Sequence, residues 1–373
     1  MAMENEARAG AQIEQDDANE PSFARKVLPK LAISLVLGAL FAWLVSRGGV
    51  PLIPSREAFA AVDWALVAAY PLVLTVTHFF RASRWRFLIA PVKHVPFKDV
   101  IALNWIGFFA IFALPLRLGE VARPALTKMR SGISISAGVG TVAVERVTDG
   151  LVTSFCVAWA LFALPMLPTD DKIAKALPFY GYLALAVFIS AFIAIGLFLW
   201  QRELATRLTK WGVGLVSKRL AEVLASKVGG IADGMRSVGE PKLFAGFTVE
   251  TLIYWGTNAA GMWLLGVACG LPMTFAHAVA VMGILAIGIL LPAGPGLFGN
   301  FQLSVSVALK IYFAADLIGE QGAVYIFLLY SIQAIFIVAV GIIPLYVMHI
   351  PMSALLKVTP DAVPRAPDAS AEG

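Results

Sequence analysis

Residues 104–123 read NWIGFFAIFALPLRLGEVAR, and the interpretation of the whole chain depends on this stretch. An apolar run ends at Pro115, and three charged residues, Arg117, Glu120 and Arg123, follow within a span of seven residues. A charged side chain in the middle of a membrane-spanning helix costs roughly 2.5–3.5 kcal/mol on insertion scales. An apolar chain therefore carries such a cluster either at the membrane edge or along a polar cavity inside the protein.

The composition predicts an all-α polytopic membrane protein. Hydrophobic residues make up 59% of the 373 residues, charged residues make up 14%, and the mean hydropathy is +0.80. Soluble domains carry about 25% charged residues. Several apolar runs reach the length of roughly 18 residues that is typical of a membrane-spanning helix. We expect about six full spans plus two re-entrant or broken hairpins, giving about six to eight crossings.

The net charge of +5 does not point to nucleic acid. The basic residues gather in loops between apolar runs, as the positive-inside rule requires, so we expect no nucleic-acid partner. Cys156 and Cys269 lie inside apolar runs, and the four histidines lack the spacing of metal ligands. We therefore expect no metal and no cofactor.

Loop charges predict the orientation and the domain organisation. Residues 81–98 hold five basic residues and no acid, so this loop should face the cytoplasm. We expect both termini to be cytoplasmic, in the inner membrane of the cell. The predicted parts are a disordered acidic tail over 1–24, a membrane domain over 25–350 with a cytoplasmic amphipathic segment at 201–242, and a disordered tail over 351–373.

Two groups of charged residues are candidates for lipid contact. Arg81, Arg84 and Arg86 in the basic loop either only fix the topology or also touch anionic headgroups. A predicted span at about 136–164 carries a second group, namely Glu145, Arg146 and Asp149. Its charges lie either in the headgroup zone or within the membrane. We favour an intramembrane polar site, because Glu145 is about nine residues, or ~13 Å of rise, into the helix.

A second broken segment, PAGPGLFGNFQ at 292–302, matches the first one in its place along the chain. The matching units, about 62–164 and 243–348, begin on opposite sides by their loop charges. We therefore predict an inverted-topology repeat with a hairpin in each half, and interrupted helices at corresponding places point to a transporter's substrate site. The simpler alternative is that proline and glycine only kink these helices.

Four motifs, RASRWRFL, LPLRLGEVARPALTKMRSGIS, TVAVERVTDGL and PAGPGLFGNFQ, resemble the membrane region of lysylphosphatidylglycerol synthase/flippase proteins. The resemblance extends from about Phe79 to Met348 and implies a flippase-like domain in a bacterial or archaeal cytoplasmic membrane. The aminoacyl-transferase domain of bifunctional members has no counterpart in this sequence, so lysine transfer by this chain is not expected.

The resemblance also implies site positions. Many relatives have an Arg-Glu pair just after the second break, whereas this chain has Asn300 and Gln302 nearby. The candidate substrate-binding residues are Arg117, Glu120, Arg123, Glu145, Arg146, Asp149, Asn300 and Gln302. The candidate hairpin breaks are Pro115, Gly119, Pro292, Gly294, Gly296 and Gly299.

Three functions are open at this point, and membrane lipids are the expected partners in the first. In the favoured one, a non-enzymatic transporter moves a lipid headgroup between leaflets; Arg117 and Arg123 bind phosphate, while Glu120, Glu145 and Asp149 balance charge, contact a cationic headgroup or carry a coupling proton. The second is an accessory subunit of an envelope-synthesis enzyme. The third is an intramembrane transferase, for which we find no Ser/His/Asp order, metal set or phosphate loop.

Overall fold

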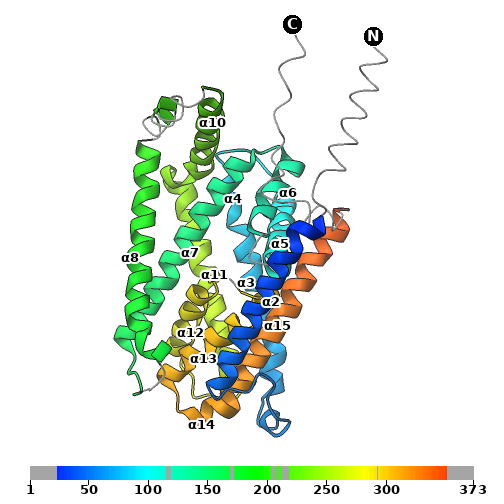
Figure 1. Ribbon diagram of the computed structural model, residues 1–373, viewed down its shortest axis with the longest axis vertical. Helices are drawn as coiled ribbons and strands as arrows, with labels where there is room; N and C mark the ends of the chain where they lie inside the picture. Colours follow the sequence, from blue (N-terminus) through cyan, green and yellow to red (C-terminus); the bar gives the residue numbers. More distant parts are fainter. Residues whose placement is uncertain are drawn as a thin grey trace.

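The chain folds into a bundle in which every regular element of the described residues is a helix, as predicted (Figure 1). The computed structural model describes residues 23–114, 119–168, 172–201, 203, 206–207, 210–211, 218–291 and 293–350. The C-terminal tail, most of 201–217, Pro115, Arg117, Pro292 and all of the predicted N-terminal tail except Phe23 and Ala24 lie outside these ranges. Phe23 and Ala24 begin a helix instead.

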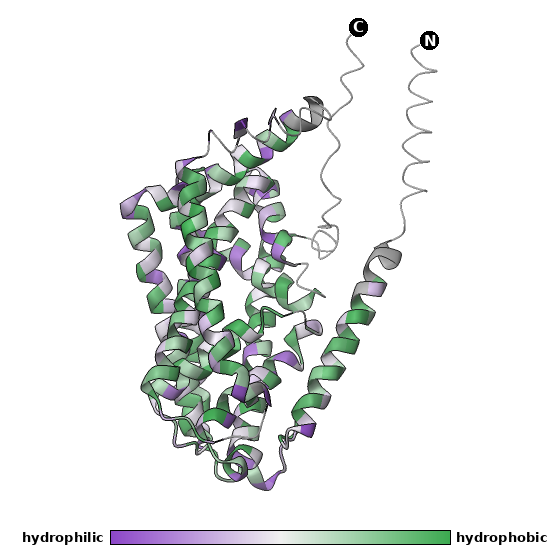
Figure 2. Ribbon diagram, turned by 60° about the vertical axis from the view of Figure 1, so that its left-hand side comes forward, coloured by the Kyte–Doolittle hydropathy of each residue, from purple (hydrophilic) through white to green (hydrophobic). Residues whose placement is uncertain are grey.

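Four helices in the described ranges are long and apolar enough to cross a membrane: Trp64–Ile89, Ile135–Ala163, Ala174–Trp200 and Ala315–Val347. Leu31–Arg47 and Phe275–Gly288 are apolar but shorter. Helix α11 (Pro241–Ala268) has 28 residues but does not belong to the four, and it carries Lys242 and Glu250. Much of the helical ribbon in Figure 2 has the colour of hydrophobic residues, as expected for a multi-pass membrane protein.

The first half contains α3 (Trp64–Ser83), α4 (Trp85–Ile89), α5 (Phe97–Ala113), α6 (Ala122–Ser131) and α7 (Ile135–Ala163). Helix α3 begins at Asp63, whose Oδ1 accepts hydrogen bonds from the amides of Ala65 and Leu66. The prediction of a loop over 81–98 is wrong for its first part, because α3 and α4 continue through it. The buried side chains of Trp85 and Leu88 fasten α4 to the core.

The second half contains α11, α12 (Phe275–Gly288), α13 (Asn300–Tyr312), α14 (Ala315–Leu317) and α15 (Ala323–Val347), with a π-helical turn at Ile318–Gly322. The segment between α12 and α13 is the second break. In Figure 1, α5 and α6 lie in the half of the bundle that contains α10 (Lys218–Met235), whereas α12, α13 and α14 lie in the other half.

Two helices cover the bundle from outside. Helix α8 (Lys172–Trp200) packs against α7 and leaves large apolar side chains such as Phe179, Ile193 and Trp200 exposed. Helix α2 (Phe23–Arg47) packs against the second break, where the hydroxyl of Ser34 donates a hydrogen bond of 2.7 Å to the carbonyl of Ala293. The second break is therefore held from outside by α2 as well as from within the bundle.

Helix α2 and the second break approach each other so closely that only glycine fits at Gly299. This residue has φ +83°, and a Cβ atom there would lie 2.4 Å from the carbonyl oxygen of Gly38. We predict that Gly299→Ala lowers the free energy of unfolding by at least about 1–2 kcal/mol, the cost of a left-handed L-residue. Thermal unfolding in detergent measures this loss.

The matched control for this substitution is Gly256→Ala in α11. No atom lies within 4 Å of the Cβ position at Gly256, and alanine is the better helix former, so this variant should be as stable as the parent or more stable. Equal losses of stability in the two variants would contradict the role given to Gly299.

Candidate functional site

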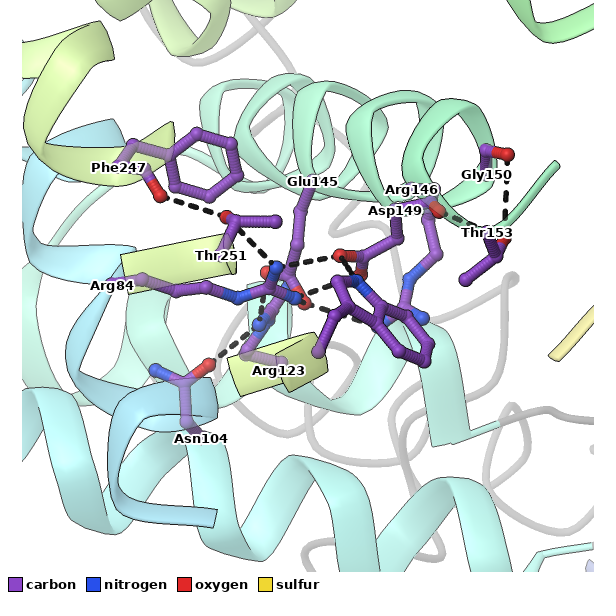
Figure 3. Close-up of polar contacts among 11 residues, drawn as sticks. Arg84, Asn104, Arg123, Glu145, Arg146, Asp149, Gly150, Thr153, Phe247 and Thr251 are labelled. Carbon is purple, nitrogen blue, oxygen red and sulfur yellow. Dashed lines mark hydrogen bonds and ion pairs between the residues drawn. The ribbon is translucent and has the colours of Figure 1, made fainter. Parts of the chain in front are cut away.

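Arg84, between α3 and α4, is the centre of a buried set of charges (Figure 3). It is 0% exposed, and its two terminal nitrogens donate to the two carboxylate oxygens of Asp149 at 2.5 and 2.7 Å. The same guanidinium also donates to Thr251 at 3.1 Å and to Glu145 at 3.3 Å. We call Arg84, Arg123, Glu145, Arg146 and Asp149 the ion cluster.

Glu145 of α7 is the carboxylate on which three guanidinium groups converge. Besides Arg84, it pairs with Arg123 at 2.7 Å and with Arg146 at 3.2 Å, and its side chain is 0% exposed. Glu145 and Asp149 are four residues apart on α7 and therefore lie on one face of the helix. Glu145 is therefore enclosed by protein, whereas its place within the membrane or in the headgroup zone stays a prediction.

Helix packing brings Arg123 to Glu145. Arg123 lies in the first turn of α6, and α6 can approach α7 because Gly138 faces Pro124. A Cβ atom at Gly138 would lie 2.9 Å from the Cβ of Pro124. Arg123 also donates a 2.5 Å hydrogen bond to the Oδ1 of Asn104 in α5. The ion cluster thereby joins α5 and α6 to α7.

The three arginines at 81, 84 and 86 have different surroundings, which corrects their joint assignment to headgroup contact. Because α3 and α4 are helical here, the three side chains leave the chain in different directions. Arg84 is buried in the ion cluster and cannot reach a headgroup at the surface. The Arg86 side chain is 38% exposed and pairs with Glu250 of α11, which also accepts a hydrogen bond from Ser83. Arg81 lies in a cavity.

This cavity, which we call the inter-hairpin cavity, has a volume of about 120 Å³. It lies where the end of α5 meets the second break, so that Phe108 and Phe112 face Ile289 and Leu297 across it. Helices α3, α11, α12, α13 and α15 complete its wall. The polar lining residues are His78, Arg81, Tyr254, Trp255, Asn258, Tyr330 and Gln333.

Tyr254 and Trp255 connect the inter-hairpin cavity to the ion cluster. Both line the cavity. The indole nitrogen of Trp255 donates a 3.0 Å hydrogen bond to Asp149, and the guanidinium of Arg84 lies 4.8 Å from the ring centroid of Tyr254. A change in the ion cluster can therefore reach the cavity through one layer of side chains.

Asn300 and Gln302 stabilise the second break and do not join the ion cluster. The amide of Asn300 donates to the carbonyl oxygens of Gly288 at 2.9 Å and Leu291 at 3.3 Å. The Oε1 of Gln302 accepts a 2.7 Å hydrogen bond from the backbone amide of Gly299. These contacts satisfy backbone groups that the interrupted helix leaves unpaired, so both residues stabilise the break. Their contact with a substrate stays a prediction.

In the second break, Gly296 with φ +69° and Leu297 with φ +59° have left-handed conformations, as Gly299 does. A non-glycine residue in this region is strained. The hydroxyl of Tyr330 in α15 donates a 3.1 Å hydrogen bond to the carbonyl of Gly296 and helps to hold the turn. Gly294, also predicted as part of this break, packs against Gly38 of α2.

The structure brings together four of the sequence-predicted residues, Arg123, Glu145, Arg146 and Asp149. Glu120 lines a recess with Arg123 and Arg146 beside Gly107, and Gly119 packs against the α5 backbone at Ala110.

The sequence analysis missed Asn104, Thr251 and Trp255 as residues of the site, and it did not predict that Arg84 is buried. The sequence signal that could have identified these residues is a polar side chain inside an otherwise apolar helix. Among the described residues, no group of His, Cys, Asp or Glu side chains is placed to hold a metal ion.

The apolar helices, the interrupted segments and the buried charges define a multi-pass integral membrane protein. The family model described as "Lysylphosphatidylglycerol synthase TM region" matches residues 30–341. The chain therefore belongs to this family, which suggests a membrane domain of the lipid-related synthase or flippase type. Comparisons with curated proteins and with solved structures gave no match.

Removing the charge of Glu145 should destabilise the fold strongly. In Glu145→Gln, Arg123 and Arg146 lose the carboxylate with which they pair, and breaking a buried ion pair costs about 3–5 kcal/mol. We expect a clear fall in the midpoint of thermal or denaturant unfolding of the purified protein. The matched control is Glu203→Gln, whose carboxylate is 86% exposed and lies 3.8 Å from Arg207. It should leave the midpoint unchanged, and equal effects of the two variants would contradict the importance of the buried charge.

Proposed function

We propose that this chain is a transporter, and not an enzyme, that moves a lipid headgroup between the two leaflets of the cytoplasmic membrane. The observation that carries the proposal is the inter-hairpin cavity, which is lined from one side by the end of α5 and from the other by the second break. Non-helical backbone at membrane depth is tolerated where it is buried in protein or lines a wet cavity. A cavity between two interrupted segments is the expected place for a transported group.

The arrangement of the two helix pairs supports this reading. Helices α5 and α6 lie in one half of the bundle and α12 and α13 in the other (Figure 1), as two hairpins that enter from opposite sides would. In an inverted repeat, a site between the two units can open to one side and then to the other. We propose this repeat for the chain, with both termini and α10 on the cytoplasmic side.

The composition of the cavity wall supports a lipid as the transported molecule. Aromatic and aliphatic side chains form most of the wall, while a few polar groups, Arg81 among them, project into it. Such a wall suits a headgroup whose acyl chains stay in the bilayer. The ion cluster behind Tyr254 and Trp255 serves as a framework that holds the first hairpin through the pair between Arg123 and Glu145.

Filling the inter-hairpin cavity should stop lipid flipping. Ala334 of α15 lines the cavity, and a phenylalanine there would occupy much of its volume. We expect that the parent protein, purified and reconstituted in liposomes, lets an impermeant reductant quench a fluorescent phospholipid that began in the inner leaflet. Ala334→Phe should reduce this quenching to the level of protein-free liposomes.

The control is Ala339→Phe, which places the same side chain on an exposed position of the same helix. It should flip lipid like the parent protein. Equal flipping by all three proteins would remove the cavity as the route. A folded parent protein that flips none of several headgroups would overturn the transport proposal and favour an accessory or enzymatic role.

A further inference from the structure

Two polar side chains of α3, His78 and Arg81, line the inter-hairpin cavity without polar partners. They are three residues apart and so lie on the same face of the helix. The guanidinium of Arg81 lies 3.8 Å from the ring centroid of Phe108 and 5.7 Å from that of Tyr254. No ion pair or hydrogen bond joins it to another residue in the described part of the chain. His78 is 5% exposed, and its Nδ1 has no hydrogen-bond partner.

This lack of partners sets Arg81 apart from the buried arginines beside it. Arg84 and Arg123 both reach carboxylates within 2.5–2.7 Å. Arg81 is partly exposed, so its guanidinium keeps some contact with solvent, whereas the buried Nδ1 of His78 carries the cost of a missing hydrogen bond. The ring contacts of Arg81 supply no hydrogen-bond acceptor for its guanidinium. The geometry is that of a site whose remaining partners come from a ligand.

The lining residues define the charge of that ligand. Arg81 and His78 are the basic side chains of the cavity wall, and no aspartate or glutamate of the described residues lines it. Asn258 of α11 adds an amide that has no side-chain hydrogen bond within the described ranges. The guanidinium fork matches the oxygens of a phosphate group and can donate two parallel hydrogen bonds to them. The wall offers no carboxylate that could receive an ammonium group.

We propose that the inter-hairpin cavity is a binding site for the phosphodiester of an anionic lipid headgroup, with Arg81 and His78 as the groups that hold the phosphate. A zwitterionic headgroup binds more weakly, because its ammonium group finds no carboxylate in the cavity. The phosphate chemistry follows from the lining residues, whereas the lipid as its source rests on the transport function proposed above.

Thermal stabilisation by added ligand tests the site without measuring transport, because a ligand that binds only the folded state raises the unfolding temperature. The full chain in detergent is titrated with short-chain phosphatidylglycerol, short-chain phosphatidylcholine and inorganic phosphate. We expect phosphatidylglycerol to bind the parent protein roughly tenfold more tightly than phosphatidylcholine, given the worth of hydrogen bonds to a charged group. Arg81→Gln should lose this preference and bind phosphatidylglycerol roughly tenfold more weakly.

The matched control is Arg236→Gln, because this arginine is 50% exposed and pairs with Asp233 outside the cavity. It should bind phosphatidylglycerol like the parent protein. Equal affinity of the parent protein for the two lipids overturns the proposal, and this result does not depend on whether any variant folds. Unchanged binding by a folded Arg81→Gln protein also overturns it.

The remaining outcomes separate this proposal from the transport function. Stabilisation by inorganic phosphate at the same affinity as by phosphatidylglycerol supports the anion site and overturns the lipid as its source. Binding of phosphatidylglycerol by a protein that flips no lipid supports the site and overturns transport. Flipping in liposomes without any preference between the two headgroups, each labelled on an acyl chain, supports transport and overturns the site.

Discussion

A carboxylate that is removed from water inside a membrane protein must be neutralised by cations at close range, and Glu145 meets this requirement with three guanidinium groups. These cations come from different parts of the fold: Arg84 from the junction of α3 and α4, Arg123 from α6, and Arg146 from α7 itself. The position of α6 and the course of α3 into α4 therefore both depend on the Glu145 side chain. Asp149 extends the same constraint to α11 through Trp255.

In the second half of the bundle, neutral side chains satisfy the polar groups that folding removes from water. The break between α12 and α13 leaves backbone amides and carbonyls unpaired, and these groups are satisfied by Asn300, Gln302, Ser34 and Tyr330. Neutral side chains can do this because backbone groups need only hydrogen bonds. The two halves are thus held by different chemistry, an ion cluster in the first half and amide and hydroxyl contacts at the second break. The inter-hairpin cavity lies where the end of α5 meets the second break.

Much of the candidate site was accessible from the sequence, because charged residues within apolar runs must be compensated. This reasoning identified Arg123, Glu145, Arg146 and Asp149, which the structure brings together. It also located the second break, since glycine and proline interrupt an apolar run there. It failed for Arg84, which charge bias grouped with Arg81 and Arg86 in a loop. The positive-inside rule uses only the number of basic residues in a segment. It contains no information on side-chain direction, and a continuing helix points neighbouring arginines toward different surroundings.

The sequence by itself determined the class of fold, since long apolar runs form helices wherever water is excluded and backbone groups must pair locally. It also determined which charged residues, because they lie within apolar runs, need partners of opposite charge in the folded protein. Only the tertiary structure decided the pairing of these charges, because partners such as Arg84 and Asp149 are 65 residues apart in the chain and meet only when α4 packs against α7. For the same reason, only the packing of α3 against α5 and α11 decided that Arg81 faces a cavity with no carboxylate among its described lining residues.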